Sequence, residues 1–129
     1  MAANLDLIRR TYDGSSDENG RNLLAVFSPG VEWTEAAGFP YAGAYVGVDA
    51  LMQGVFHRLA TEWEGYRADV HAYLEEGDKV AAFGVYFGRY KATGKSMTAS
   101  FAHLYEIRDG RIMRMTQYVD SVMVLKALS

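Results

Sequence analysis

Four segments in the second half of the chain alternate apolar and polar side chains, and short turns join them. The segments cover residues 66–75, 80–92, 97–107 and 112–120. The turns between them are Glu76-Gly77-Asp78, Thr93-Gly94-Lys95 and Asp109-Gly110. Glycine and aspartate at such positions favour the tight turns of β-hairpins. Consecutive hairpins predict an antiparallel sheet, and this constrains the fold more than any other feature of the sequence.

The first half of the chain has mainly helical periodicity. The apolar faces of three predicted helices contain Leu5, Ile8 and Tyr12, then Leu23, Leu24 and Phe27, then Leu51, Met52, Val55, Phe56 and Leu59. Ser15 and Glu18 have capping-box spacing, and Asp49 is the predicted N-cap of the third helix. A short strand at 31–36 and a glycine- and proline-rich loop at 36–47 separate the second and third helices. Helices followed by a meander predict an α+β fold.

Aromatic side chains lie on both faces of the predicted strand at 80–92. Two phenylalanines share one face and two tyrosines share the other: Phe83 and Phe87, then Tyr86 and Tyr90. An antiparallel sheet covered by helices on one side normally has a polar second face. Gly84 and Gly88 also interrupt this strand, and glycine permits sharp bending. The pattern therefore predicts a strongly curved sheet wrapped round a helix, with a concave face lined by aromatic side chains.

The composition excludes several classes of function. The net charge is -3 without any basic run, which argues against partners such as nucleic acid or an anionic membrane. The chain has no cysteine, and its three histidines lack the spacing of metal ligands, so we expect no metal site. The N-terminus lacks the apolar core of a signal peptide, and no apolar run is long enough to span a membrane. We expect a single domain over residues 1–129 of a cytoplasmic protein.

Two ionisable residues within apolar strands are candidates for acid–base chemistry. Glu35 is either a buried general base, whose pKa burial would raise, or an exposed glutamate paired with Arg58 or Arg67. His103 alternates in phase with Phe101 and Tyr105, so all three side chains should point the same way. His103 is either a core residue bonded to one carbonyl or a hydrogen-bonding group of a pocket.

Asp120 and Gln117 lie near the end of the last predicted strand. Asp120 either joins the pocket, with His103 as a hydrogen-bond partner, or caps the sheet or pairs with Arg114 or Lys126. In a regular strand Gln117 and Asp120 point to opposite faces. Either a bulge turns both inward or only one of them belongs to the site.

The aromatic residues are numerous for a closed core of this size. The chain has nine Tyr, six Phe and two Trp, and buried phenol groups require hydrogen-bond partners. Some of these rings should therefore line a cavity instead of filling the core. The candidates for ligand-binding residues are Trp33, Tyr41, Tyr45, Phe56, Tyr86, Phe101, Gln117 and Tyr118.

Four stretches that span almost the whole chain carry a resemblance to a known superfamily. They are LLAVFSPGVEWTE, YAGAYVGVDAL, EEGDKVAAFG and FAHLYEIRDGRIMRMTQYVD. Together they resemble the SnoaL-like branch of the nuclear transport factor 2-like superfamily, which includes ketosteroid isomerase and polyketide cyclases. The resemblance implies a conical half-barrel with a deep apolar pocket, usually without metal or cofactor. It also implies a homodimer formed through the sheet.

The same resemblance implies roles for individual residues. In ketosteroid isomerase a carboxylate base follows the end of the second helix by eight residues, and that position is Glu35 here. The isomerase's hydrogen-bonding acid, on the strand before the last hairpin, corresponds to His103. Its tyrosine on the first helix would fall nearer Ile8 than Tyr12, so we transfer that role to no residue. The catalytic aspartate of the polyketide cyclases falls at Gln117.

Residues and resemblance together predict a protein that binds a small apolar molecule and performs proton-transfer chemistry on it. Isomerisation, cyclisation or dehydration would use Glu35, His103 and Asp120 as catalytic acid–base groups. A binding or sensing domain without chemistry is the alternative, and a purely protein-binding dimer module is a third. These three candidate functions differ in whether the three side chains point into a cavity.

Overall fold

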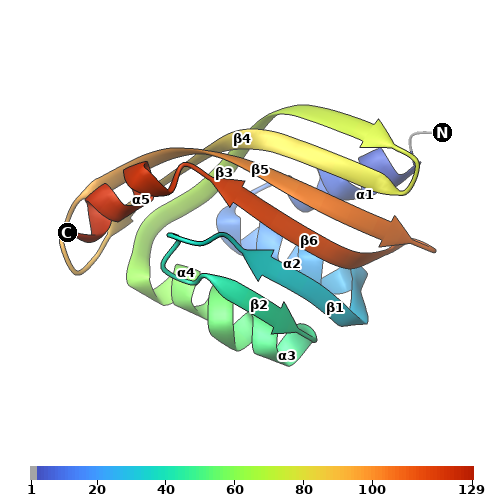
Figure 1. The fold of residues 1–129 in the computed structure, drawn as a ribbon, viewed down its shortest axis with the longest axis horizontal. Coiled ribbons are helices and arrows are strands. Elements are labelled where there is room, and N and C mark those ends of the chain that lie inside the picture. The colour runs from blue at the N-terminus through green and yellow to red at the C-terminus, as the bar shows by residue number, and fades with distance from the viewer. Residues whose placement is uncertain (1–2) are drawn as a thin grey trace.

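The described chain forms one curved sheet with helices against its inner face (Figure 1). The computed structural model describes residues 3–129, so the first two residues of the predicted domain lie outside the described residues. The helical segments are α1 (Ala3–Thr11), α2 (Ser16–Val26), α3 (Val48–Leu51), the π-helical η1 (Met52–Phe56), α4 (His57–Glu62) and α5 (Ser121–Leu128). The strands are β1 (Phe27–Glu35), β2 (Gly43–Val46), β3 (Trp63–Glu76), β4 (Lys79–Tyr90), β5 (Ser96–Arg108) and β6 (Arg111–Val119). The predicted α+β class is confirmed.

The sheet contains the predicted meander and two pairings of β1 that were not predicted, with β2 and with β6. Its strand order is β2-β1-β6-β5-β4-β3. β3 to β6 pair as consecutive antiparallel hairpins, as the turn sequences indicate. β1 instead pairs with β6 in parallel, with Trp33 opposite Met115. The expectation of a purely antiparallel sheet is wrong at this position, because a long connection, not a hairpin, brings β1 and β6 together.

Several element boundaries differ from the sequence predictions. Residues 43–46 of the predicted loop form β2, although glycine and alanine have low strand propensity. α2 ends at Val26, because Phe27 already has an extended backbone and begins β1. Gly47, and not Asp49, is the N-cap of the third helix. α5 has no counterpart among the predicted elements, whereas the predicted capping box at the start of α2 is present.

A glycine in β4 allows a close approach to β3 where the sheet bends. β3 has a register shift between Val70 and Ala72, and a bulge of this kind bends and twists a strand. Gly84 lies opposite Val70, and any Cβ at this position would overlap the carbonyl oxygen of Asp69. The backbone atoms of β3 therefore occupy the space that a side chain would need. This agrees with the prediction that glycine in β4 permits bending.

Strand alternation decides which candidate residues face the interior. Glu35, His103 and Gln117 are the buried polar side chains of β1, β5 and β6. They share the inner face with buried rings of the same strands and of β4: Trp33, Tyr86, Phe101 and Tyr105. The outer face has partly or fully exposed apolar side chains, among them Phe83, Leu104 and Tyr118. The curvature therefore gathers the polar candidates of three strands on one concave surface.

Candidate functional site

A cavity of about 510 Å³ lies between the concave face of the sheet and the helices. α2 contributes Leu23, η1 contributes Phe56 and α4 contributes Leu59 to its wall. The strands and the residue after α1 contribute these polar side chains to its lining: Tyr12, Glu35, Tyr66, Tyr86, His103 and Tyr105. The helices add others, among them Asp17, Asn19 and Arg21 of α2. Apolar walls with a few convergent polar groups are typical of sites for small molecules.

Glu35 is a buried carboxyl group with one hydrogen-bond donor beside it. Alternation along β1 turns Trp33 and Glu35 to the same side, and the Trp33 Nε1–H donates to Glu35 Oε2 at 3.3 Å. Burial raises the pKa of Glu35 to about 8, and the bond from Trp33 offsets only part of this. Arg58 and Arg67 pair with Glu62 and Asp69 instead. The exposed, salt-bridged alternative for Glu35 is therefore wrong.

His103 is held between two tyrosine hydroxyl groups. Tyr12 Oη lies 2.6 Å from His103 Nδ1, and Tyr86 Oη is hydrogen-bonded to His103 Nε2. Burial lowers the pKa of His103 to about 3, so the imidazole is neutral at physiological pH. A neutral imidazole donates with one ring nitrogen and accepts with the other. His103 therefore lies in the site but acts on the cavity through its tyrosine partners.

The hydrogen bonds of His103 continue in both directions. Tyr12 Oη is also 2.6 Å from Tyr105 Oη. At the other end, Gln117 Nε2 donates to Tyr86 Oη at 2.9 Å. The backbone N–H of Ala36 donates to Gln117 Oε1, again at 2.9 Å. We name this series, from Ala36 through Gln117, Tyr86, His103 and Tyr12 to Tyr105, the hydrogen-bond chain.

Asp120 lies outside the cavity, which corrects the prediction that it joins the pocket. β6 ends at Val119, and Asp120 is the exposed N-cap of α5, where its Oδ1 accepts from the Met123 N–H at 3.4 Å. The prediction that Tyr118 binds the ligand is also wrong, because its side chain is 56% exposed on the outer face of the sheet. Of the polar pair at the end of the last strand, only Gln117 faces the interior. No bulge reverses that alternation, since residues 114–119 pair with β5 without a shift, and the irregularity in this pairing lies between Ile112 and Arg114.

The predicted ligand-binding rings fall into two groups. Trp33, Phe56 and Tyr86 line the cavity. Phe101 lies behind it, stacked on Tyr86 with ring centroids 4.2 Å apart. Tyr41 and Tyr45 are structural and do not line the cavity, because each is engaged elsewhere.

The hydroxyl groups of these two structural tyrosines connect the loop before β2 to α4. Tyr41 donates to Glu62 at 2.7 Å and accepts from Trp63 Nε1–H at 3.0 Å. Tyr45 donates to the Tyr41 carbonyl oxygen at 2.8 Å. Their phenol groups are therefore satisfied within the protein, which removes them from the set of ligand-binding candidates.

Three tyrosines of the cavity wall were not among the sequence candidates. Tyr12, Tyr66 and Tyr105 each present a phenol to the cavity. Positional counting against ketosteroid isomerase pointed to Ile8, although Tyr12 lies one helical turn later on the same face. Tyr105 alternates in phase with His103, so strand periodicity was a usable signal for it. Tyr66, at the beginning of a predicted strand, had no comparable signal.

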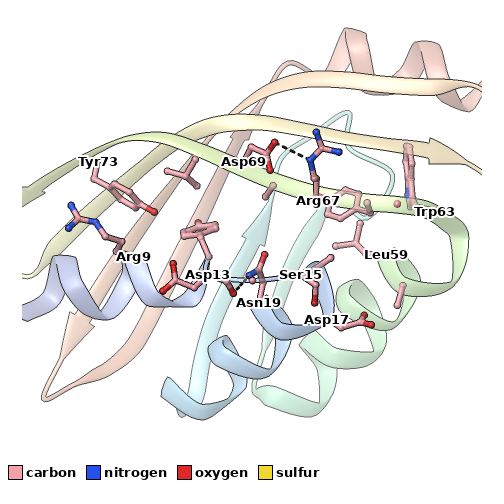
Figure 2. A pocket seen from close by; sticks show the side chains of 18 residues that line it. Arg9, Asp13, Ser15, Asp17, Asn19, Leu59, Trp63, Arg67, Asp69 and Tyr73 are labelled. Carbon is pink, nitrogen blue, oxygen red and sulfur yellow. Dashed lines mark hydrogen bonds and ion pairs between the residues drawn. The ribbon is translucent and has the colours of Figure 1, made fainter.

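A second, more open cleft of about 740 Å³ lies between β3 and the turn from α1 to α2 (Figure 2). Charged side chains surround it, including Arg9, Asp13 and Asp17. It shares lining residues with the inner cavity, among them Tyr12 and Leu59. The inner cavity therefore adjoins a polar cleft at the open edge of the fold.

The described residues contain neither a cluster of metal ligands nor a membrane-spanning helix. Within residues 3–129, no group of three or more histidine, cysteine, aspartate or glutamate side chains could hold a metal ion. No helix in that part of the chain is both long and apolar enough to cross a membrane.

Comparison with known proteins places the site in context. The model of the SnoaL-like domain family matches residues 8–115. The fold is similar to that of an NTF2-like protein from Burkholderia thailandensis E264, with 35% sequence identity, a TM-score of 0.92 and coverage of 100% of this chain and 99% of that chain. TerC, in a structure co-crystallized with polyporic acid, is 26% identical with a TM-score of 0.83 and 98% coverage of both chains. A putative SnoaL-like polyketide cyclase from Jannaschia sp. CCS1 is 19% identical with a TM-score of 0.81, covering 99% of this chain and 92% of that chain. Among curated proteins, none matches the sequence significantly.

The burial of Glu35 predicts how the free energy of unfolding depends on pH. The Glu35 pKa is raised from its ordinary value of 4.5 to about 8 in the folded protein. Between these values the folded state retains a proton that the unfolded state has released, so stability falls as pH rises. Relative to Glu35→Gln, wild-type protein should lose about 5 kcal/mol at most between pH 4.5 and pH 8. Chemical denaturation of both proteins across this range measures the difference.

Glu32→Gln is the matched control for this experiment. It removes an exposed carboxylate from the same strand and should leave the pH dependence of wild-type protein in place. The lowered pKa of His103 acts in the opposite direction, since its contribution is lost as pH falls below 6.5, but it is common to all three proteins. A constant difference between wild type and Glu35→Gln over this pH range would contradict a buried, uncharged carboxyl group.

Proposed function

We propose that this chain, which belongs to the SnoaL-like domain family, binds a small apolar carbonyl compound in its inner cavity and catalyses a proton transfer on it. One observation carries this proposal. A buried carboxyl group with a pKa of about 8 lines the same cavity as a series of tyrosine hydroxyl groups organised by an imidazole. Titratable groups with strongly shifted pKa values gather at catalytic sites more often than elsewhere.

Glu35 is the proton acceptor in this mechanism. Its ionised form removes a proton from the carbon next to the carbonyl group, and a pKa near the working pH makes such a base effective. At pH 7 about a tenth of the carboxyl groups are ionised, and this fraction rises steeply toward pH 8. The protonated form then returns the proton to another atom of the substrate. Isomerisation, aldol-type cyclisation and dehydration all share this first step.

Tyrosine hydroxyl groups stabilise the oxygen that gains negative charge. Tyr86 and Tyr105 line the cavity, and preorganised donors of this kind account for a large share of enzymatic rate enhancement. His103 orients the hydroxyl groups on its two ring nitrogens and does not donate a proton as an imidazolium, because its pKa is lowered to about 3. Of the three predicted catalytic residues, we retain Glu35 directly and His103 as a positioning residue. Asp120 caps α5 and has no part in the mechanism.

A ligand-binding or sensing domain without catalysis is the second candidate function. Glutamine takes the position that corresponds to the aspartate of the polyketide cyclases, and here its amide serves within the hydrogen-bond chain. With Glu35 protonated and His103 neutral, the buried titratable groups of the cavity carry no charge at neutral pH, which suits binding of an apolar molecule. The charged Asp17 and Arg21 of its wall are exposed to solvent. A molecule that co-purifies, is observed by native mass spectrometry and is released unaltered would favour this function.

Activity assays with a steroid enone, an epoxide and a polyketide-like ketone test the catalytic function. We expect Glu35→Gln to lower kcat/KM for the accepted substrate by about 10²–10⁴-fold, since it removes a general base. In wild-type protein kcat/KM should rise with pH and level off above the Glu35 pKa of about 8. Glu32→Gln should keep wild-type activity, because Glu32 is exposed on the same strand. Unchanged turnover in Glu35→Gln would remove Glu35 from the mechanism.

We further propose that the protein is a homodimer formed through the outer face of the sheet. Phe83, Ala102 and Tyr118 lie side by side across β4, β5 and β6, and Leu104 follows on the same face of β5. These side chains are partly or fully exposed in the single chain. Burying such a patch against a second copy would remove apolar surface from water.

Leu104→Glu tests this interface. A charge in the middle of the apolar patch should shift sedimentation from dimer to monomer without changing the far-ultraviolet circular dichroism. Ala25→Glu is the control, because it adds the same charge at an exposed position of α2, on the opposite side of the sheet. A wild-type protein that sediments as a monomer at high concentration would contradict the dimer.

A further inference from the structure

The hydrogen-bond chain has a donor of fixed direction at one end. A backbone N–H can only donate, so the atom of Gln117 that faces Ala36 N is the amide oxygen. The amide nitrogen of Gln117 therefore faces Tyr86 and donates to its hydroxyl oxygen at 2.9 Å. The orientation of this amide thus follows from the backbone of residue 36.

His103, in the middle of the chain, has one ring proton for two tyrosine partners. Its burial keeps it neutral, so one ring nitrogen donates and the other accepts. If Nε2 accepts from Tyr86, Nδ1 carries the proton and donates to Tyr12. If Nε2 carries the proton, every bond from Tyr86 to Tyr105 is reversed. The two arrangements leave a hydroxyl proton without a protein acceptor at different ends, on Tyr105 or on Tyr86.

We infer that the bonds run in one direction, from Ala36 to Tyr105, so that Tyr105 presents the hydroxyl proton that a ligand oxygen accepts. Tyr86 accepts from Gln117 and donates to His103 Nε2. His103 Nδ1–H donates to Tyr12, and Tyr12 O–H donates to Tyr105. Neither Tyr86 nor Tyr12 accepts twice, and bonds aligned in one direction strengthen one another.

The reversed arrangement distributes the same groups less evenly. The Tyr86 oxygen would then accept N–H bonds from both Gln117 and His103, and its own proton would need a third partner. The neighbouring Tyr66 hydroxyl group could take this proton, but the Tyr86 oxygen would still have to accept two bonds. The Tyr105 oxygen, meanwhile, would accept no bond. Tyr105 has a single protein partner, Tyr12, so its proton is the one that remains available to the cavity.

Tyr105 lies beside Trp33, which donates a hydrogen bond to the proposed base. Its ring centroid is 6.2 Å from that of Trp33, whose Nε1–H is bonded to Glu35. Both Tyr105 and Glu35 line the inner cavity. This inference deepens the proposed function, on which its catalytic consequence rests: the substrate is a carbonyl compound whose oxygen accepts from Tyr105 while the neighbouring C–H faces Glu35. Gln117 and His103 are then positioning residues that set which hydroxyl group donates.

Nitrogen NMR of the histidine rings tests the direction of the chain without any ligand. Protein labelled with ¹⁵N at histidine should show a protonated Nδ1 and an unprotonated Nε2 for His103 at pH 7. Variants His57→Gln and His71→Gln, both at exposed positions, assign the three histidines. A protonated Nε2, or a doubly protonated ring, would overturn the inference. This result is independent of catalysis, so it can fail while the proposed function stands.

A matched pair of probes tests which hydroxyl group donates to a ligand. 9-Fluorenone and fluorene have the same ring system, and only the first has a carbonyl oxygen. Wild-type protein should bind fluorenone several-fold to about tenfold more tightly than fluorene, and the carbonyl stretch of bound fluorenone should shift to lower frequency. Tyr105→Phe should abolish both the preference and the shift.

Tyr66→Phe is the control for this experiment. Its hydroxyl group also lines the cavity but is not a member of the hydrogen-bond chain. It should therefore keep the preference for fluorenone and the carbonyl shift. Loss of both in Tyr66→Phe, or their persistence in Tyr105→Phe, would assign the donor to another residue and overturn the inference. An inactive protein that still shows the Tyr105-dependent shift would contradict the catalytic function alone.

Discussion

The two hydrogen bonds between tyrosine hydroxyl groups and the ring nitrogens of His103 connect the parts of this fold. Tyr12 directly follows α1, whereas Tyr86 comes from β4 and His103 from β5. Gln117 adds β6, and through the N–H of Ala36 the end of β1 is included. A buried polar group is destabilising unless it is hydrogen-bonded. The hydrogen-bond chain therefore forms only when the end of α1 and the four strands are packed correctly against one another. No described buried side-chain nitrogen or oxygen lacks a partner, which agrees with a cavity whose polar wall is organised throughout.

The same surroundings keep two titratable groups uncharged. Burial lowers the pKa of His103 to about 3 and raises that of Glu35 to about 8. At neutral pH the predominant form of the cavity is therefore an imidazole and a carboxylic acid, not an ion pair. Burial of Glu35 lowers the free energy of unfolding at neutral pH, because the unfolded chain can ionise this carboxyl group more easily. Proteins keep such destabilising groups mainly where function requires them. A cavity of this kind accepts an apolar ligand without the cost of desolvating a charge, and ionised Glu35 is then a strong base.

Much of the fold follows from local signals in the sequence. The turns at 77–78, 94–95 and 109–110 and the alternation between them predict β3 to β6 correctly, because hairpins depend on neighbouring residues. The parallel pairing of β1 with β6 was not predicted, since it joins residues separated by about two thirds of the chain. β2 has glycine and alanine where strand formers are expected, and α5 is too short and apolar to be distinguished from a strand end. These errors concern elements that tertiary contacts decide.

The candidate site was predictable in part for the same reason. Glu35 and His103 lie on strands whose alternation turns them inward, and Gln117 is the inward member of its pair. Asp120 was assigned to the pocket because the strand was expected to reach it, whereas β6 ends at Val119 and the carboxylate caps a helix. Tyr12 was missed because a positional comparison with ketosteroid isomerase does not show how α1 packs on the sheet. The hydrogen-bond chain joins residues as far apart as Tyr12 and Tyr105, which no local pattern specifies.

The protonation state of Glu35 is the most direct test of the proposed site. An infrared difference spectrum between wild-type and Glu35→Gln protein, with ¹³C-labelled glutamate, isolates the carboxyl group of this residue. We expect a protonated carboxyl band at pH 7 that converts to a carboxylate band with a midpoint near pH 8. A carboxylate band already complete at pH 6 would contradict it.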